Sequence, residues 1–205
     1  MSFQQVVKVP NDRIGVIIGK DGRVKDEIEI KCKVLIRINS ESGSVIISPR
    51  DTSQLEQAFK AVEIVSAISR GFSPERSYRL LGEDMLLQVV DLNEYVGRSP
   101  NQITRLKGRL IGEGGKSRKT IEDLTGTAIS IYGHTVAIIG NFEDIKHASD
   151  AILHLVRGRS HKTVYNLLQE KRRRDKIDKL HLWEESNLKN EKSPGNSSNS
   201  IESRE

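Results

Sequence analysis

Two short glycine-rich segments have the residue types and spacing that could do chemistry in this chain. The first reads Gly19-Lys20-Asp21-Gly22 and the second Gly112-Glu113-Gly114-Gly115. A segment with helical spacing follows each of them, and the first N–H groups of a helix have no partner inside that helix. Those N–H groups and the helix dipole attract anions, and glycine lets another backbone approach closely. Both segments therefore predict a site for a phosphate-bearing chain.

The two segments belong to an internal repeat with an offset of 93 residues. Gly15, Gly19 and Gly22 fall on Gly108, Gly112 and Gly115 at this offset. The match continues downstream through a further set of apolar pairs: Ile28 with Ile121, Ile36 with Ile129, Ile38 with Ile131, and Val45-Ile46 with Ile138-Ile139. Glycines in register with apolar spacing after them indicate two copies of one structural unit.

Apolar periodicity predicts the order β-α-α-β-β-α in each copy. In the first copy the expected elements are a strand at 5–9, helices at 11–17 and 22–31, strands at 34–39 and 45–47, and a helix from 55 to 68. In the second copy they are a strand at 85–92, helices at 100–111 and 116–124, strands at 128–132 and 136–139, and a helix at 142–156. The second copy has an extra stretch at 93–102. A short helix is expected from Ser73-Pro74, because proline is favourable at the first helical position.

The first copy resembles the KH domain. The segment VPNDRIGVIIGKDGRVKDEIE is similar to the KH signature, with its Ile-Ile-Gly-x-x-Gly-x-x-Ile-x-x-Ile spine. The element order resembles the eukaryotic, type I arrangement. The resemblance implies an α+β fold of two tandem type I KH modules, for which we expect a pseudo-twofold arrangement. It also implies that both glycine loops hold the backbone of single-stranded RNA, over roughly four nucleotides each.

The whole of residues 4–180 resembles one KH family in particular. The order Ile-Gly-Glu-Gly-Gly-Lys, Tyr-Gly, Val-Ala-Ile-Ile-Gly and Val-Tyr-Asn-Leu-Leu is similar to archaeal relatives of the partner-of-Nob-one ribosome assembly factor. That resemblance implies non-catalytic binding of the 3′ region of small-subunit ribosomal RNA during maturation. It also implies two protein partners, the Nob endonuclease and the alpha subunit of initiation factor 2.

The two loops differ in charge. Glu113 stands where a basic residue is common and would repel a phosphate if it pointed inward, but Lys116, Arg118 and Lys119 follow it at once. Apolar side chains beside the loops offer a surface for splayed bases. The predicted RNA-binding residues are Ile14, Gly15, Ile18, Gly19, Lys20, Asp21, Gly22, Arg23 and Lys25 in the first copy, and Arg105, Gly108, Arg109, Ile111, Gly112, Glu113, Gly114, Gly115, Lys116, Arg118 and Lys119 in the second. A double change of Gly19 and Gly22 to Asp is expected to weaken RNA binding and leave the fold intact.

We divide the chain into a first module at 1–71, a linker at 72–84, a second module at 85–158, a C-terminal helix at 159–183 and a disordered tail at 184–205. The basic run from Lys171 to Lys176 lies in the helix. We give about half the weight to a solvated helix face for this run and the rest to a phosphate contact. The tail is rich in Ser, Asn, Glu and Lys, a composition typical of disorder.

The composition of the 205 residues limits the other classes. The net charge of +5 and the pI of about 9.3 are compatible with a polyanionic partner. Cys32 is the only cysteine, so no disulfide within the chain and no cysteine metal cluster can form. We find no long apolar N-terminal core and no run near the roughly 20 residues that span a bilayer. We therefore expect a cytoplasmic monomer without cofactor or membrane contact.

Three alternatives remain open at this point. An enzyme needs a site, and the chain has no Walker loop, dinucleotide fingerprint or nucleophile elbow. The carboxylates Asp21, Asp26, Glu27 and Glu29 could hold magnesium, although interleaved cations make a plain helix face the simpler account. An RNA-decay or exosome-like adaptor would need strands for a separate barrel. A protein-interaction scaffold would use the KH surfaces to bind proteins.

Overall fold

The computed structural model describes residues 4–51, 55–97 and 99–191, with the backbone alone for 179 and 182–191. The chain divides into two compact units, Met1–Leu168 and Gln169–Glu205, and the first unit contains both repeats. Residues 192–205, the larger part of the predicted disordered tail, lie outside the described residues.

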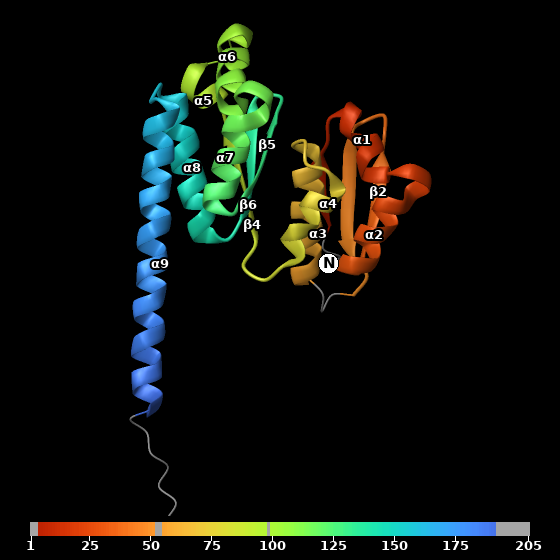
Figure 1. Ribbon diagram of the computed structural model, residues 1–205. Coiled ribbons are helices and arrows are strands. Elements are labelled where there is room, and N and C mark those ends of the chain that lie inside the picture. The colour runs from red at the N-terminus through yellow and green to blue at the C-terminus, as the bar shows by residue number, and fades with distance from the viewer. Residues whose placement is uncertain (1–3, 52–54, 98, 192–205) are drawn as a thin grey trace, which may run out of the picture. The chain divides into compact units, whose positions relative to one another are not determined.

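The first module has the predicted element order (Figure 1). It consists of β1 (Gln5–Lys8), α1 (Asn11–Ile18), the single turn η1 (Lys20–Gly22), α2 (Arg23–Cys32), β2 (Val34–Asn39), β3 (Ser44–Pro49) and α3 (Leu55–Ser69). The three strands form an antiparallel sheet in the order β1-β3-β2, so β2 is an edge strand. One face of this sheet packs against the helices around buried side chains such as Ile17, Ile28, Val45 and Ile64.

The second module repeats this arrangement. It consists of β4 (Leu86–Asp91), the short α5 (Asn93–Val96), α6 (Pro100–Ile111), η4 (Glu113–Gly115), α7 (Lys116–Thr125), β5 (Ala128–Tyr132), β6 (Thr135–Gly140) and α8 (Phe142–Val156). Its sheet has the order β4-β6-β5, so the edge strand β5 corresponds to β2. The α+β fold of two type I modules is confirmed, and α5 occupies the predicted extra stretch.

The hairpin corrects one detail of the repeat. Ile38 pairs with Val45 in the first sheet, and Ile131 pairs with Val136 in the second. The turn between the two strands is therefore two residues shorter in the second module, and Val45 corresponds to Val136. The match of Val45-Ile46 with Ile138-Ile139 at the earlier offset was wrong, because apolar residues recur along both strands and hide the shift.

The linker between the modules contains α4 (Pro74–Ser77) and η3 (Tyr78–Leu81). The side chain of Ser73 accepts a hydrogen bond from the N–H of Arg76 at 3.5 Å, and Pro74 is the first helical residue, as predicted. Phe72 and Leu80 are fully buried in one core with Ala128, Ala137 and Ile139 of the second module. The linker thus joins the two modules through a continuous apolar contact.

The contact between the modules is heterologous, not twofold. The first module contributes α3 and the linker, and the second contributes the outer face of its sheet. Ala128 and Ser130 are buried there, whereas the corresponding side chains of β2, Leu35 and Arg37, are exposed. A twofold arrangement would bury the same surface on both modules. The pseudo-twofold expectation is therefore wrong, because a linear repeat does not determine which faces meet.

Polar contacts fix this junction at its edge. The backbone oxygen of Arg70 accepts a hydrogen bond from Ser130 Oγ at 2.9 Å. A Cβ on Gly71, whose φ is +97°, would come within 2.7 Å of Tyr132 Cβ, so only glycine allows this approach. The Tyr132 hydroxyl donates to Asp12 on α1, and this hydrogen bond raises the pKa of Tyr132.

The last helix, α9, runs from His161 to Glu191, beyond the end predicted at 183. Val164 and Leu168 at its start are buried in the core of the second module. No described helix is both long enough and apolar enough to cross a membrane.

Candidate nucleic-acid interface

The two glycine loops have the same backbone conformation despite different sequences. The first glycine has φ and ψ of 72° and 179° in Gly19 and of 72° and 176° in Gly112. The third position has a φ of 55° in Asp21 and 57° in Gly114, and the fourth a φ of 79° in Gly22 and 81° in Gly115. Loop 1 (Gly19–Gly22) and loop 2 (Gly112–Gly115) are therefore two copies of one structure.

Packing explains the first glycine of each loop. A Cβ on Gly19 would lie 2.5 Å from Val24 Cγ2 and 2.9 Å from the Val24 nitrogen. A Cβ on Gly112 would lie 2.8 Å from the Ser117 nitrogen. Because backbone cannot move aside cheaply, a change at either glycine disturbs the start of the next helix. The Gly19, Gly22 double change expected to spare the fold is therefore an unsuitable test.

The loops leave the start of each following helix open to an anion. Gly22 precedes α2 and Gly115 precedes α7, and neither helix has a side-chain hydrogen bond to its first turn. A Cβ placed on Gly15 or Gly108 would meet no atom within 4 Å, so the protein surface at the glycine before each loop is open. The first N–H of each helix is used within the loop, where Arg23 donates to the Lys20 oxygen and Lys116 to the Glu113 oxygen. The geometry therefore suits a phosphate beside the N–H groups that follow, with a strand laid across the glycines.

Most of the predicted side chains are exposed or partly exposed around the two loops. Those exposed around loop 1 are Lys20, Asp21 and Arg23, and those exposed around loop 2 are Arg105, Glu113, Lys116 and Lys119. Ile18, Lys25, Ile111 and Arg118 are partly buried beside the loops. Lys25 is also engaged in an ion pair with Glu29 at 3.6 Å.

Two predicted residues also have contacts within the fold. Ile14 is only 5% exposed and belongs to the core, so it supports loop 1 from beneath and offers no surface to a base. Arg109 Nη2 donates to the backbone oxygen of Arg159 at 2.5 Å, and the Arg109 oxygen lies 3.0 Å from His161 Nε2. Arg109 therefore ties α6 to the segment that begins α9.

Comparisons with known proteins match this geometry. Residues 86–173 match a model of the eukaryotic type KH domain (KH-domain type I), and residues 4–64 match a KH domain model. A KH domain-containing protein of Methanocaldococcus jannaschii is 43% identical over 87% of this chain and 78% of its own length. The pre-rRNA-processing protein PNO1 of Chaetomium thermophilum is 33% identical over 67% of this chain and 54% of its own length. The chain belongs to the PNO1 family of KH-domain proteins.

Solved structures of this family agree with the fold. One is a crystal structure of a complex of a/eIF2alpha, aDim2p and rRNA from Pyrococcus horikoshii. The matched chain is 43% identical with a TM-score of 0.79, and the match covers 84% of this chain and 95% of that one. The resemblance to the archaeal members of the family, first carried by the loop and hairpin motifs, is confirmed.

The sequence did not indicate the role of a pair of glutamates that this PNO1-family chain places at the edge strands. Glu29 Oε1 accepts a hydrogen bond from the Ile36 N–H at 2.7 Å, and Glu122 Oε1 accepts one from the Ile129 N–H at 2.6 Å. Each carboxylate thus occupies an outward donor of β2 or β5. The two glutamates stand at the repeat offset of the glycines, so a search for matching charged residues could have found them.

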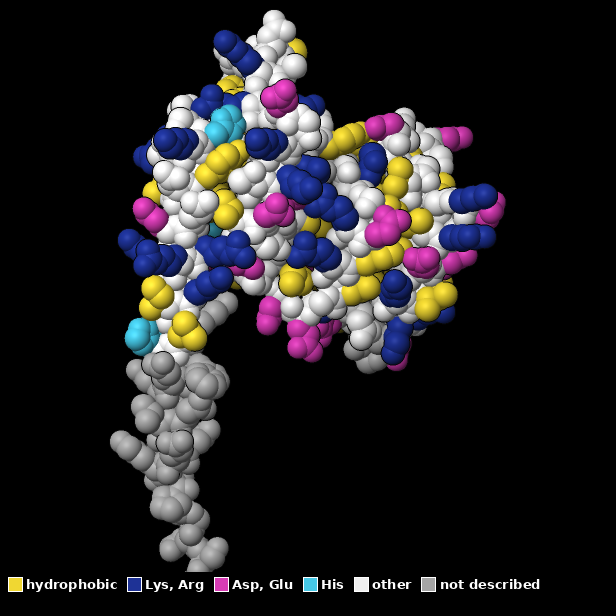
Figure 2. All heavy atoms as spheres, viewed as in Figure 1, with side chains coloured by type: hydrophobic (Ala, Val, Ile, Leu, Met, Phe, Trp, Pro, Cys, Tyr) yellow, Lys and Arg dark blue, Asp and Glu magenta, His cyan; other side chains and the backbone are white. Residues whose placement is uncertain are grey.

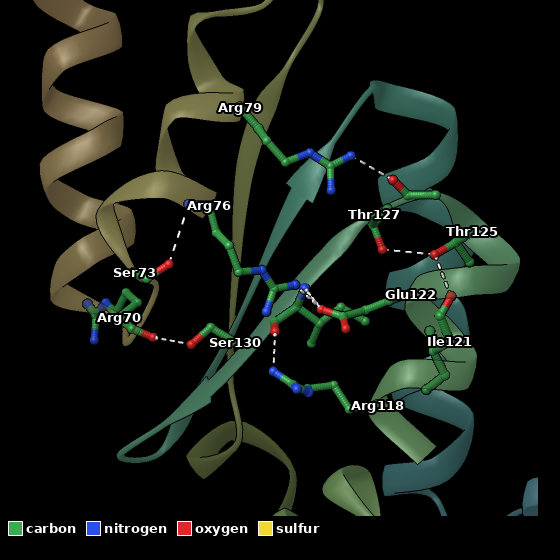
Figure 3. A network of polar contacts seen from close by, with 12 residues as sticks. Arg70, Ser73, Arg76, Arg79, Arg118, Ile121, Glu122, Thr125, Thr127 and Ser130 are labelled. Atoms are coloured by element: carbon green, nitrogen blue, oxygen red, sulfur yellow. Dashed lines mark hydrogen bonds and ion pairs between the residues drawn. The ribbon is translucent and has the colours of Figure 1, made fainter. Parts of the chain in front are cut away.

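A second set that the sequence missed comes from the linker (Figure 3). Arg76 donates to Glu122, and Arg79 Nη2 donates to the backbone oxygen of Gly126 at 2.8 Å. Both side chains reach across to the second module beside Arg118, whose Nη1 lies 3.5 Å from the Ile129 oxygen. No sequence signal could have found them, because the linker has no counterpart in the repeat.

The carboxylates that suggested a magnesium site do not converge. Within the described ranges, no group of three or more His, Cys, Asp or Glu side chains is arranged to hold a metal ion. Glu29 is instead used by the Ile36 N–H and by Lys25.

Proposed function

We propose that the protein is a non-catalytic RNA-binding factor of ribosome biogenesis that holds single-stranded small-subunit ribosomal RNA at its two loops. The observation that carries this proposal is the shared backbone conformation of loops 1 and 2. Each loop precedes a helix that has no side-chain cap, and the surface at the glycine before each loop is open. Such a surface suits backbone recognition of a single strand. The 3′ region of the RNA is our more specific proposal for the target.

The partners follow from the same family. A relative is found with rRNA and a/eIF2alpha in one complex, which supports the alpha subunit of initiation factor 2 as a partner of this protein. Binding to the Nob endonuclease stays a prediction, and so does location in the cytoplasm.

Matched charge reversals at each loop test the proposal. Lys20→Asp changes an exposed lysine within loop 1, and Lys116→Asp changes the exposed lysine that directly follows loop 2. Neither position is buried, and an acidic residue is favourable in the first turn of a helix such as α7. Both variants should therefore fold, which thermal unfolding can verify.

Binding is measured by fluorescence anisotropy with a labelled oligonucleotide of the small-subunit rRNA 3′ end, over a range of salt concentrations. Each variant should bind roughly tenfold more weakly, because a carboxylate beside the phosphate opposes charge-assisted contacts. Affinity of the unchanged protein should also fall steeply with salt. Binding that ignores both loop changes and salt would contradict the proposal and favour a protein-interaction scaffold.

A further inference from the structure

The α7 helix of the second module is lined by three arginines, two of which come from outside that module. Arg118 is on α7 itself, Arg76 contacts Glu122, and Arg79 contacts the oxygen of Gly126. Positions 118, 122 and 126 follow one another at four-residue spacing, so they share one face of the helix. Their separation along the axis is about 6 Å per step. This row begins next to loop 2, where Lys116 and Lys119 are exposed.

The row of arginines is part of a positively charged area on the face drawn in Figure 2. Dark blue side chains gather near the centre of the face in Figure 2, in the region between α7 and α4. Glu122 offsets one charge of the row through its ion pair with Arg76. Arg79 is exposed, and the side chain of Arg76 remains 38% exposed in spite of the ion pair.

Each guanidinium is held in place by a protein oxygen. An arginine has five N–H donors, and one contact to a carbonyl or carboxylate leaves the others free to bind a phosphate. Because the side chains are already held, a ligand loses less conformational entropy in ordering them. These arginines therefore form a preorganised anion surface that continues from loop 2 along the edge strand β5.

The first module has its own cation at the place where the second module uses an arginine of the linker. There, Arg50 follows β3 directly, and its Nη2 lies 4.0 Å from Glu29 Oε2 while its Nε donates to the Val34 oxygen at 3.2 Å. In the second module the corresponding position is Asn141, whose side chain caps α8 by accepting from the Asp144 N–H at 2.8 Å. The second module thus has no cation of its own at this place, and Arg76 of the linker supplies it.

We propose that Arg76 and Arg79 of the linker are RNA-binding residues that complete the RNA site of the second module. The strand held at loop 2 continues along α7 over Arg118, Arg76 and Arg79, and its phosphates contact their guanidinium groups. Arg76 has a further part, because it neutralises Glu122, a carboxylate that would otherwise face the RNA. This inference rests on the proposed RNA-binding function and specifies the path of the strand beyond loop 2.

The test uses the full chain carrying Lys20→Asp, so that binding reports on the second module, with the same labelled rRNA oligonucleotide. Arg79→Gln should lower the salt slope of log affinity by about 0.7, the loss expected for one phosphate contact to a single strand. Lys146→Gln is the charge-matched control. Lys146 is exposed beside β4, at the opposite edge of the same sheet, and its change should leave the slope unaltered.

A second pair of variants separates RNA contact from simple support of the fold. Arg76→Gln should weaken binding about tenfold, since it removes a contact and exposes the Glu122 charge. Adding Glu122→Gln should recover part of that loss, because the amide oxygen still accepts from Ile129 while the charge is gone. A role confined to bracing the modules predicts no recovery, since the ion pair stays broken.

The outcomes distinguish this inference from the proposed function. If Lys116→Asp weakens binding but Arg76→Gln and Arg79→Gln do not, the linker path is wrong and the proposed function stands. If the unchanged protein does not bind the oligonucleotide, the proposed function itself fails. If the arginine changes weaken binding of a protein partner and spare RNA affinity, the surface is a protein interface and the inference is overturned.

Discussion

The two modules share one backbone design but differ in what covers them. The outer face of the first sheet is open, with Leu35 and Arg37 exposed on β2, whereas the same positions of β5, Ala128 and Ser130, are buried under the linker and α3. Loop conformation is the same in both, since it depends on local glycines and the helices beside them. The two modules therefore differ mainly in the segments that pack against them. In the first module, the glutamate at the edge strand, Glu29, pairs with Arg50 of the same module. In the second module, Glu122 pairs with Arg76 of the linker.

The largest expected effect comes from placing one charge at equivalent points of the two outer faces. Ala128→Asp should lower the free energy of unfolding by about 4 kcal/mol, because the carboxylate is buried among apolar side chains. Leu35→Asp should cost about 1 kcal/mol or less, since this position stays in water. Urea unfolding of both variants checks the difference, and similar losses would contradict the heterologous contact.

The next effect concerns the close approach of the modules at Gly71. Gly71→Ala should destabilise the protein by about 2 to 4 kcal/mol, the sum of a positive-φ penalty and a clash with Tyr132. Gly158→Ala is the control, because Gly158 has a similar φ of +92° but a Cβ there would meet no atom within 4 Å. It should cost only the backbone penalty of about 1 to 2 kcal/mol. Thermal unfolding of the two variants measures the part due to the clash.

A pH effect distinguishes Cys32 in the first module from its repeat partner Thr125 in the second. Burial raises the pKa of the Cys32 thiol from 9.0 to about 11. The unfolded chain releases this proton first, so the stability from the neutral buried thiol is present below pH 9 and is lost as the pH rises to about 11. Between wild type and Cys32→Ala, this loss should amount to about 2 kcal/mol.

Denaturant unfolding across that pH range measures the loss. Thr125 donates to the Ile121 oxygen at 2.8 Å and has no such titration, so Thr125→Ala should show the same pH dependence as wild type. A stability difference between wild type and Cys32→Ala that does not change with pH would refute the assignment to the thiol.

The smallest effect concerns one repeat position that makes different contacts in the two modules, Asn39 in the first and Tyr132 in the second. Asn39 accepts hydrogen bonds from the N–H groups of Glu41 and Ser42 at 3.1 Å within its own turn, whereas Tyr132 reaches Asp12 of the other module. Tyr132→Phe should cost about 0.5 to 1 kcal/mol. A double-mutant cycle with Asp12→Asn should show coupling for Tyr132 and none for Asn39→Ala.

Local patterns determined most of the fold and part of the site. Glycine spacing predicted both loops, and the alternation of Ile36 and Ile38 predicted a strand, because such features depend on a few neighbouring residues. The same patterns placed α7, β5 and α8 within a residue of their observed limits. They failed at Ile14, since a short helix beside a loop presents apolar residues both to the core and to solvent, and spacing alone does not separate these faces.

The sequence by itself determined that two similar α+β units carry paired glycine loops, because the repeat encodes each unit through short-range contacts. Only the tertiary structure decided that the first module covers the second sheet, that Glu29 and Glu122 occupy the edge-strand donors, and that Arg76 and Arg79 cross to α7. These features join residues far apart in the chain, such as Arg76 and Glu122, and side-chain complementarity between distant surfaces leaves no period in the sequence.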